Sequence, residues 1–325
     1  MNENNITVFL NSTLTKDMNT IKNKVIMYFY NSIPDKDNKK LLSNNNFKAN
    51  SKICAMLSFY KNNSMKCNDI VRKQIYENNL NSKWIFFEAN PIARYRISKF
   101  KDKNEFSRIC LKSQYHQDSI YINNYDNNRW NMILKETDIK VNDWRKDGKH
   151  ILFILNSCKH CGYSMKDVDL HQWVNSTIKI IRDSGCKRKI VIRLKCGNDK
   201  LKVNKKKKYI SYFHLDKEIK YHDPLNNIEF ANKNKLGLLK ELENAWCSVV
   251  YSTSACVISI IKGIPVFYQS ENTITSKVSS NDFSNIENPY MPDRDKFFRE
   301  FSNQIWSLEE IKSGIVWEKI KKNLV

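Results

Sequence analysis

The chain has 325 residues, 41% of them hydrophobic and 12% aromatic, and this composition excludes a disordered tail. The length suits one large domain or two medium ones, each able to bury a core. No apolar stretch approaches the roughly 20 residues that cross a bilayer, and the first residues lack the basic start and long apolar core of a signal peptide. We therefore expect a soluble, cytoplasmic protein with no membrane span.

The formal net charge is +21, from 55 Lys and Arg against 34 Asp and Glu. A field of that sign attracts nucleic acid, nucleotide phosphates or anionic membrane surfaces. Part of the excess can equally reflect a composition dominated by Lys and Asn, as an AT-rich genome produces. The charge alone leaves open whether the substrate is a polyanion.

The first half of the chain alternates short apolar runs with a helical pattern. Strands are expected over residues 6–11, 24–30, 52–60 and 83–89. The segment 68–80 carries its apolar side chains at helical spacing, so the last two strands and this helix predict a strand–helix–strand unit of a parallel sheet. The segment 90–128, rich in Asn, Tyr and Arg, is expected to form loops.

A second series of the same kind follows. Strands are expected over residues 149–156, 187–195 and 264–268, and helices over 168–185, 255–263 and 307–325. The segment 235–252 is expected to form a helix followed by a strand. In the last helix Ser307 and Glu310 form a capping-box pattern. We therefore expect an α/β protein of two lobes, 1–148 and 149–303, facing each other across a cleft, with a C-terminal helical segment, 304–325. In open parallel sheets ligands bind outside the carboxyl ends of the strands.

The nine cysteines are odd in number and irregular in spacing, so reduced thiols are expected. Cys158 and Cys161, with His160 between them, have the spacing of metal ligands. Zinc sites usually combine two such pairs, and no second CxxC occurs, although Cys186 and Cys196 are further candidates. We expect no bound metal.

Three consecutive hydroxyl residues, Ser252, Thr253 and Ser254, stand where an expected strand ends and an expected helix begins. A helix start has unpaired N–H groups and a partial positive charge, and hydroxyls there can hydrogen-bond phosphate oxygens. Capping alone needs one hydroxyl, so the trio favours an anion site over a simple N-cap. Neither the Walker glycine motif nor the dinucleotide glycine motif occurs.

Charged side chains at other strand ends are candidates for the chemistry. Arg193 can form a bidentate pair with a diphosphate, or a plain surface salt bridge. Glu88, at the carboxyl end of a strand in the first half, is a candidate general base. Asp126, Arg129, Asp167 and Asp169 compete with it, although such residues are more often turn or cap residues.

Several stretches of the second half occur in an order that resembles one group of enzymes. They are "ILFILN", "GYSMKDVDLHQWVNSTIKIIR", "RKIVIRLK", "ENAWCSVVYSTSACVISIIKGIPVFYQ" and "NIENPYMPDRDKFFREFSNQIWSLEEIKSGIVWEKI". With "NNRWNMILKETDIKVNDWRKDGKHILF" they resemble the GT-B-like glycosyltransferases of bacteriophages and large DNA viruses, which are distantly similar to capsule-polysaccharide transferases. The resemblance covers about Arg129 to Ile320. It implies two Rossmann-like lobes and, for a viral protein, the host cytoplasm.

The resemblance also implies a reaction, in which a sugar is transferred from a nucleotide-sugar donor that serves as co-substrate, with no cofactor and no metal. The donor phosphates would lie against Arg193 and the hydroxyl trio. Where capsule-type relatives carry His-Pro after the strand Arg, this chain has Leu194, Lys195 and Cys196, and Lys195 could meet phosphate. The nucleotide would lie near Asn156, Gly162 and Ser164. The acceptor would bind the first half.

The acceptor expected is a hydroxymethylated pyrimidine base in DNA, which the enzyme would reach by flipping the base out of the duplex. The segment 90–116 mixes aromatic and basic residues, as suits phosphate contact and base stacking. Its candidate contacts are Arg94, Arg96, Lys99, Lys101 and Arg108. An ordinary lysine-rich loop is the alternative. Two other functions remain open: transfer to a surface glycan or lipid-linked sugar, and non-catalytic nucleic-acid binding on the same scaffold.

Overall fold

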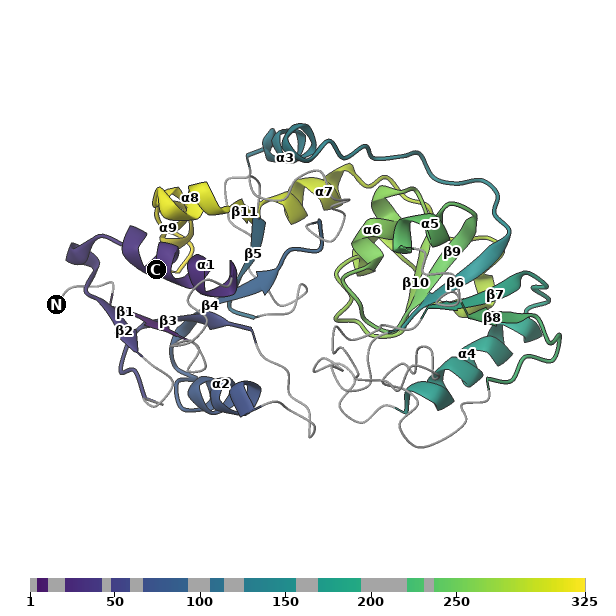
Figure 1. The fold of residues 1–325 in the computed structure, drawn as a ribbon, viewed down its shortest axis with the longest axis horizontal. Coiled ribbons are helices and arrows are strands. Elements are labelled where there is room, and N and C mark those ends of the chain that lie inside the picture. The colour runs from purple at the N-terminus through teal and green to yellow at the C-terminus, as the bar shows by residue number, and fades with distance from the viewer. Residues whose placement is uncertain are drawn as a thin grey trace, which may run out of the picture. The chain divides into compact units, whose positions relative to one another are not determined.

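The computed structural model describes residues 5–10, 21–42, 48–58, 67–92, 106–113, 126–155, 169–193, 221–230 and 237–324. The chain divides into two compact units: Met1–Lys61, Met65–Ile139 and Arg294–Val325 form the first, and Asn62–Ser64 and Lys140–Asp293 the second. The division falls at 139/140 and 293/294 and not at the expected 148/149 and 303/304. The C-terminal segment is part of the first unit, because its strand and helices pack on that unit's sheet (Figure 1).

The first unit contains a six-stranded sheet in the order β11-β5-β4-β3-β1-β2. Its strands are β1 (Ile6–Phe9), β2 (Lys39–Leu42), β3 (Ile53–Leu57), β4 (Lys83–Ala89), β5 (Phe106–Leu111) and β11 (Ile305–Ser307). Four neighbouring strands, β2, β1, β3 and β4, are parallel to one another. β5 runs antiparallel to both β4 and β11. The expected strand–helix–strand unit is confirmed, with an added antiparallel edge that the sequence patterns did not indicate.

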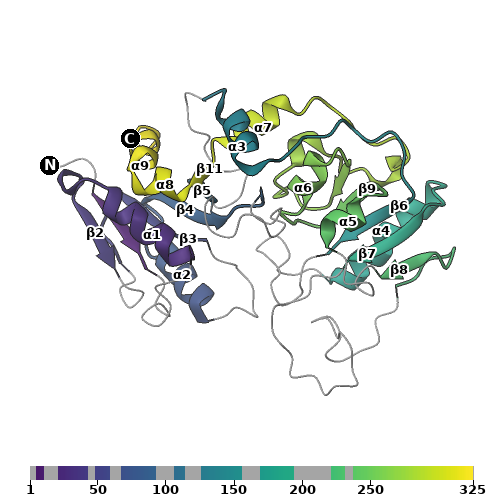
Figure 2. The ribbon, with the colours of Figure 1, turned by 45° about the horizontal axis from the view of Figure 1, so that its top comes forward.

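Helices cover both faces of this sheet. The helices of the first unit are α1 (Ile21–Ser32), α2 (Cys67–Glu77), α3 (Arg129–Thr137), α7 (Asp295–Ser302), α8 (Leu308–Lys312) and α9 (Ile315–Lys321), with a 3-10 turn η2 (Asp35–Asp37). α3 and α7 pack against each other, with the Trp130 and Phe298 ring centroids 4.5 Å apart. α1, α8 and α9 share one core cluster with alternate residues of β1, β3 and β4, and α2 packs on the other alternate residues. Figure 2 shows the two terminal helices beside α1.

The run 24–30, expected as a strand, lies in α1. Its buried residues Val25, Ile26 and Phe29 share the helix face that meets the sheet, and Lys24 is exposed. A short apolar run fits a strand and a buried helix equally well, and here the spacing of the buried positions is helical. The expectation of loops throughout 90–128 is wrong at β5, whose six residues are all buried.

The second unit contains a five-stranded, wholly parallel sheet in the order β10-β9-β6-β7-β8. Its strands are β6 (His150–Ile154), β7 (Lys189–Arg193), β8 (Ile228–Phe230), β9 (Ala245–Val250) and β10 (Val266–Tyr268). Its helices are α4 (Leu170–Asp183), α5 (Leu238–Leu242) and α6 (Cys256–Ile261), with 3-10 turns η7 (Ser276–Val278) and η8 (Phe283–Asn285). The α/β class and the parallel sheet expected for this half are confirmed.

The two faces of this second sheet are covered by different helices (Figure 1). α4 buries Trp173, Val174, Ile178 and Ile181 against alternate residues of β6 and β7. α6 packs through Ser259, whose hydroxyl is hydrogen-bonded to that of Ser248 in β9 at 2.9 Å. Within the described ranges, no helix has the length and apolarity needed to cross a membrane.

Candidate functional site

The carboxyl ends of β9, β6 and β7 form one edge of the second unit's sheet. In the register of the sheet, Arg193 is level with Ile154 of β6, and Val249 of β9 is level with Phe153. β9 and β7 flank β6, so their backbones lie about 10 Å apart, twice the usual strand spacing. Arg193 and the turn after β9 therefore share this edge, where parallel sheets bind their ligands.

The turn that follows β9 contains the hydroxyl trio Ser252, Thr253 and Ser254, all half-buried. Thr253 Oγ1 accepts a hydrogen bond from the Ala255 N–H at 3.4 Å, and the Thr253 carbonyl accepts one from the Cys256 N–H at 3.1 Å. The next amides of α6 also have partners within the turn. The expectation of unpaired N–H groups here is wrong for residues 255–258. An anion at this turn would meet side-chain hydroxyls.

The turn is held from two sides. The Tyr251 carbonyl accepts hydrogen bonds from the Ser270 N–H at 2.9 Å and from Thr273 Oγ1 at 3.4 Å. The Tyr251 ring packs edge-on against Trp173 of α4, with ring centroids 5.2 Å apart, and Trp173 Nε1 donates to Gln269 Oε1 at 3.0 Å. Burial raises the pKa of Tyr251 above its usual value. These contacts hold Tyr251, the residue that directly precedes the trio.

Gly263, in the "KGIPV" stretch after α6, has a positive φ of 69°. A Cβ there would lie 1.9 Å from the Asp143 carbonyl oxygen. The backbone of residues 142–145 crosses at this point, because the Asn142 N–H donates to the Ile261 carbonyl and the Arg145 N–H to the Gly263 carbonyl. Glycine is required by both the backbone angle and the close approach.

Arg193 is not an isolated cation, because its guanidinium forms an ion pair with Glu241. Its Nη1 lies 2.5 Å from Oε2 of Glu241 in α5, and the side chains are 26% and 5% exposed respectively. The salt bridge anticipated as the alternative role of Arg193 is present, but its carboxylate is buried. Burial raises the pKa of Glu241, and Arg193 opposes that rise. Glu241 is not predicted by the sequence, because "LLKELEN" has the pattern of an ordinary surface helix.

The two candidate bases lie in the first unit. Glu88 is half-buried near the end of β4, opposite Arg108 of β5, and its carbonyl accepts a hydrogen bond from Ser107 Oγ at 3.2 Å. Asp126 is exposed and its carboxylate accepts from the Asn128 N–H at 3.0 Å, as a turn residue does. The competing residue Asp169 caps α4, accepting from the N–H groups of residues 171 and 172.

Arg108 is not a surface contact for nucleic acid. Its side chain is 4% exposed, and its Nε donates to Gln304 Oε1 at 3.0 Å. β5 lies between β4 and β11, which encloses the guanidinium in the first unit. The prediction that Arg108 binds a phosphate is therefore wrong.

Other predicted residues lie outside the described part of the chain. They are Arg94, Arg96, Lys99, Lys101, Asn156, Cys158, His160, Cys161, Gly162, Ser164, Asp167, Lys195 and Cys196. Cys186 is described, and its thiol is buried and free. Across the described ranges no three His, Cys, Asp or Glu side chains are grouped as metal ligands would be.

No protein family and no curated protein matches the chain. Among solved structures, the chain is similar to KpsC of Thermosulfurimonas dismutans, a beta Kdo 2,7 transferase, with 11% identity and a TM-score of 0.49 over 97% of this chain and 100% of that one. It is also similar to TarM, with 12% identity and a TM-score of 0.35 over 93% of this chain and 56% of that one.

Proposed function

We propose that the protein is a nucleotide-sugar-dependent glycosyltransferase whose donor diphosphate binds at the carboxyl edge of the second unit's sheet. The observation that carries the proposal is the placement of Arg193 and the hydroxyl trio at the ends of β7 and β9, on either side of β6. A guanidinium can bind two diphosphate oxygens at once, and hydroxyls can donate to the others. The sequence resemblance to GT-B-like glycosyltransferases supports the same reaction.

These groups fit the charge change of glycosyl transfer. When the bond between the anomeric carbon and the diphosphate oxygen breaks, negative charge grows on the departing diphosphate. Fixed donors aimed at that charge stabilise the transition state more than the ground state. Arg193 supplies such donors from the end of β7, and the trio supplies them from a turn whose backbone is held by hydrogen bonds.

The remaining roles are assigned from the sequence. Lys195 would add a second cation beside the diphosphate, and Asn156, Gly162 and Ser164 would contact the nucleotide. Glu88 would take the proton of the acceptor hydroxyl as general base, with Asp126 as the second candidate.

For the acceptor we propose a hydroxymethylated pyrimidine base in DNA. The support is the net charge of +21, which favours a polyanion. Arg94, Arg96, Lys99 and Lys101 would contact its phosphates. Transfer to a surface glycan or lipid-linked sugar keeps the same donor edge and changes only the acceptor.

Two measurements test the proposal. Thermal unfolding is followed with a panel of nucleotide sugars, since a ligand that binds only the folded protein raises the unfolding free energy by about 2.7 kcal/mol at one hundred times its Kd. The nucleotide sugar that binds is then incubated with hydroxymethylated DNA or with glycan acceptors. Sugar on DNA supports the full proposal, and sugar on glycans alone changes the acceptor. Nucleic-acid binding with no nucleotide-sugar binding or hydrolysis would indicate a non-catalytic protein.

A further inference from the structure

The ion pair between Arg193 and Glu241 differs from the other buried arginine–carboxylate pairs among the described residues. Asp223 accepts from Arg182 Nε and Nη2 at 2.8 Å each and from two backbone N–H groups at 3.1 Å. Glu310 accepts from both terminal nitrogens of Arg129 and from the Ser307 N–H. Glu241 has the contact of Oε2 with Arg193, while Oε1 is buried with no hydrogen-bond partner among the described residues.

The pKa directions follow this difference in partners. Hydrogen bonds from Arg182 lower the pKa of Asp223. Burial acts to raise the pKa of Glu310, but the hydrogen bonds from Arg129 hold that pKa below its usual value. At Glu241 burial prevails over Arg193, and the pKa is raised. A carboxylate satisfied by one ion pair depends on that pair for its charge.

We infer that Glu241 is the internal counter-ion of Arg193, that a donor diphosphate displaces it from the guanidinium, and that the freed carboxylate then takes up one proton. This inference rests on the proposed function, because the ligand is the diphosphate of the nucleotide sugar. Glu241 acts through Arg193 and is a positioning residue. It aligns the guanidinium in the empty site and becomes neutral when the phosphate replaces it.

The exchange balances in charge and protons. The empty pair is Arg193⁺ with Glu241⁻. The bound state holds Arg193⁺ on a phosphate oxygen and a neutral Glu241 carboxyl, whose proton comes from solvent. No covalent bond to carbon forms or breaks. Burial drives the uptake, because a buried carboxylate without its ion partner is costlier than a protonated one.

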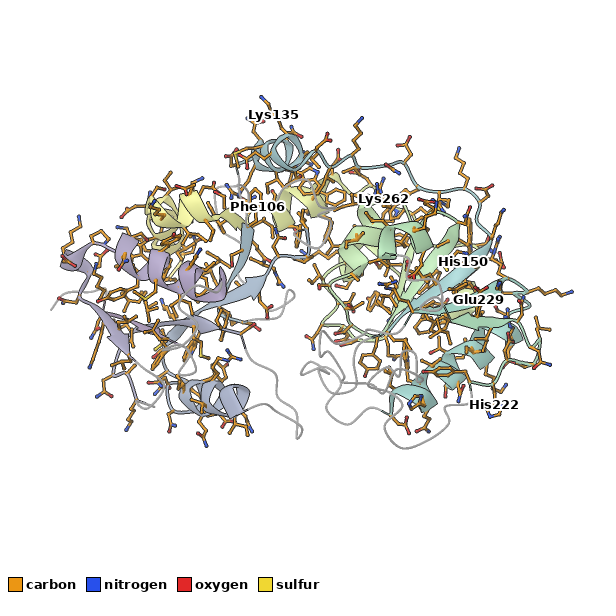
Figure 3. All side chains as sticks on the ribbon, viewed as in Figure 1. Phe106, Lys135, His150, His222, Glu229 and Lys262 are labelled. Carbon is orange, nitrogen blue, oxygen red and sulfur yellow. The ribbon has the colours of Figure 1, made fainter. Side chains whose placement is uncertain are left out.

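Few other titratable groups of the described chain face Glu241. On its own helix turn, Lys240 and Glu243 pair with each other at 2.7 Å. His150 of β6 contacts the Glu241 carbonyl through Nε2 at 3.1 Å, and Arg145, Lys189 and Glu229 act on that imidazole. Figure 3 labels His150 and Glu229. Burial first of all lowers the pKa of His150, so this ring is neutral above about pH 6.5.

The test is calorimetric binding in two buffers of different ionisation enthalpy, which counts the protons taken up with each ligand. The probes are UDP-glucose, GDP-mannose, ADP-glucose and CDP-glycerol, whose diphosphates are diesters and do not titrate near neutrality. For a probe that binds, we expect uptake approaching one proton per site. Because binding takes up a proton, the affinity should fall as the pH rises, by up to about tenfold per pH unit.

Three variants locate the proton. Glu241→Gln should bind with no proton uptake and with an affinity that does not change with pH. Glu243→Gln, which alters the exposed neighbour, and His150→Gln should keep the wild-type uptake. If Glu241→Gln does not fold, the proton uptake of the wild type and of His150→Gln still tests the inference. Uptake in both supports it, and no uptake in the wild type contradicts it.

The outcomes separate this inference from the proposed function. Binding of a probe with no proton uptake overturns the counter-ion exchange and leaves the donor site standing. The same holds if Glu241→Gln retains the wild-type uptake. If none of the probes binds, the donor site itself is wrong and the inference falls with it.

Discussion

Arg129 of α3 and Glu310 of α8 form a two-pronged ion pair, with Nη1–Oε1 at 2.7 Å and Nη2–Oε2 at 2.8 Å. Arg129 is buried, its Nε also donates to the carbonyls of Ser302 and Ile305, and its guanidinium lies 3.8 Å from the centroid of the Trp306 ring. One side chain thus fastens the C-terminal segment to α3. This contact is part of the reason that the segment belongs to the first unit.

Arg129→Met should destabilise the protein by about 3–5 kcal/mol, because it leaves the Glu310 carboxylate and two buried carbonyls without their donor. Urea unfolding measures this loss. Lys179→Met is the control, since Lys179 forms an exposed pair with Asp183 on α4 and should cost no more than about 0.5 kcal/mol. Equal losses in the two variants would contradict the role given to Arg129.

Gly263→Ala should cost about 2–5 kcal/mol, the sum of left-handed strain and a clash with the Asp143 carbonyl. Gly185→Ala is the matched control. Gly185 also has a positive φ, 87°, but nothing lies within 4 Å of its added Cβ, so only the strain of about 1–2 kcal/mol applies. A Gly263→Ala protein as stable as Gly185→Ala would show that the 142–145 backbone can move away.

Arg193→Ala should lower kcat for sugar transfer by about 100- to 1,000-fold, since it removes a donor from the developing charge of the diphosphate. Ser252→Ala should have a smaller effect in the same direction. Initial rates with saturating donor measure both, and Lys179→Ala, which removes the same charge from an exposed position on α4, should leave the rate unchanged. Wild-type rates in Arg193→Ala would remove the guanidinium from the mechanism.

Asp223 should make the protein sensitive to acid. Its pKa is lowered in the folded state, chiefly by hydrogen bonds from Arg182, so the folded protein binds fewer protons there than the unfolded chain does. Its stabilisation is complete above about pH 4 and is lost as the pH falls through the lowered value.

The measurement for Asp223 is the free energy of unfolding against pH. Asp223→Asn should lower it by about 3–5 kcal/mol at neutral pH and flatten its decline in acid. Asp183→Asn, at an exposed position, should lower the unfolding free energy at neutral pH by no more than about 0.5 kcal/mol. A profile unchanged by Asp223→Asn would assign the acid sensitivity to other groups.

The sequence predicted those elements whose signal is local. The strands around residues 83–89 and 150–154 are apolar runs bounded by polar residues, and the structure confirms them. The capping box of Ser307 and Glu310 is present, with the Ser307 N–H donating to Glu310 Oε2 at 2.8 Å. Each of these features depends on residues a few positions apart.

Only the tertiary structure decided the features that join distant segments. The run 24–30 became a helix because a neighbouring sheet buries one helical face of it. Arg108 became a core residue because β11, nearly two hundred positions later, closes the sheet beside it, with Gln304 as its partner. Glu241 became the partner of Arg193 because the fold brings the α5 and β7 side chains, 48 positions apart, into contact.

The sequence by itself therefore determined the α/β class, the positions of most strands along the chain, and the hydroxyl trio and Arg193 as candidate site residues. The tertiary structure decided the limits of the two units, the antiparallel edge of the first sheet and the buried counter-ion of Arg193. The physical reason is that hydrophobic spacing and capping act between near neighbours. Burial, ion pairing and sheet order depend on which distant segments meet, and no local pattern encodes those meetings.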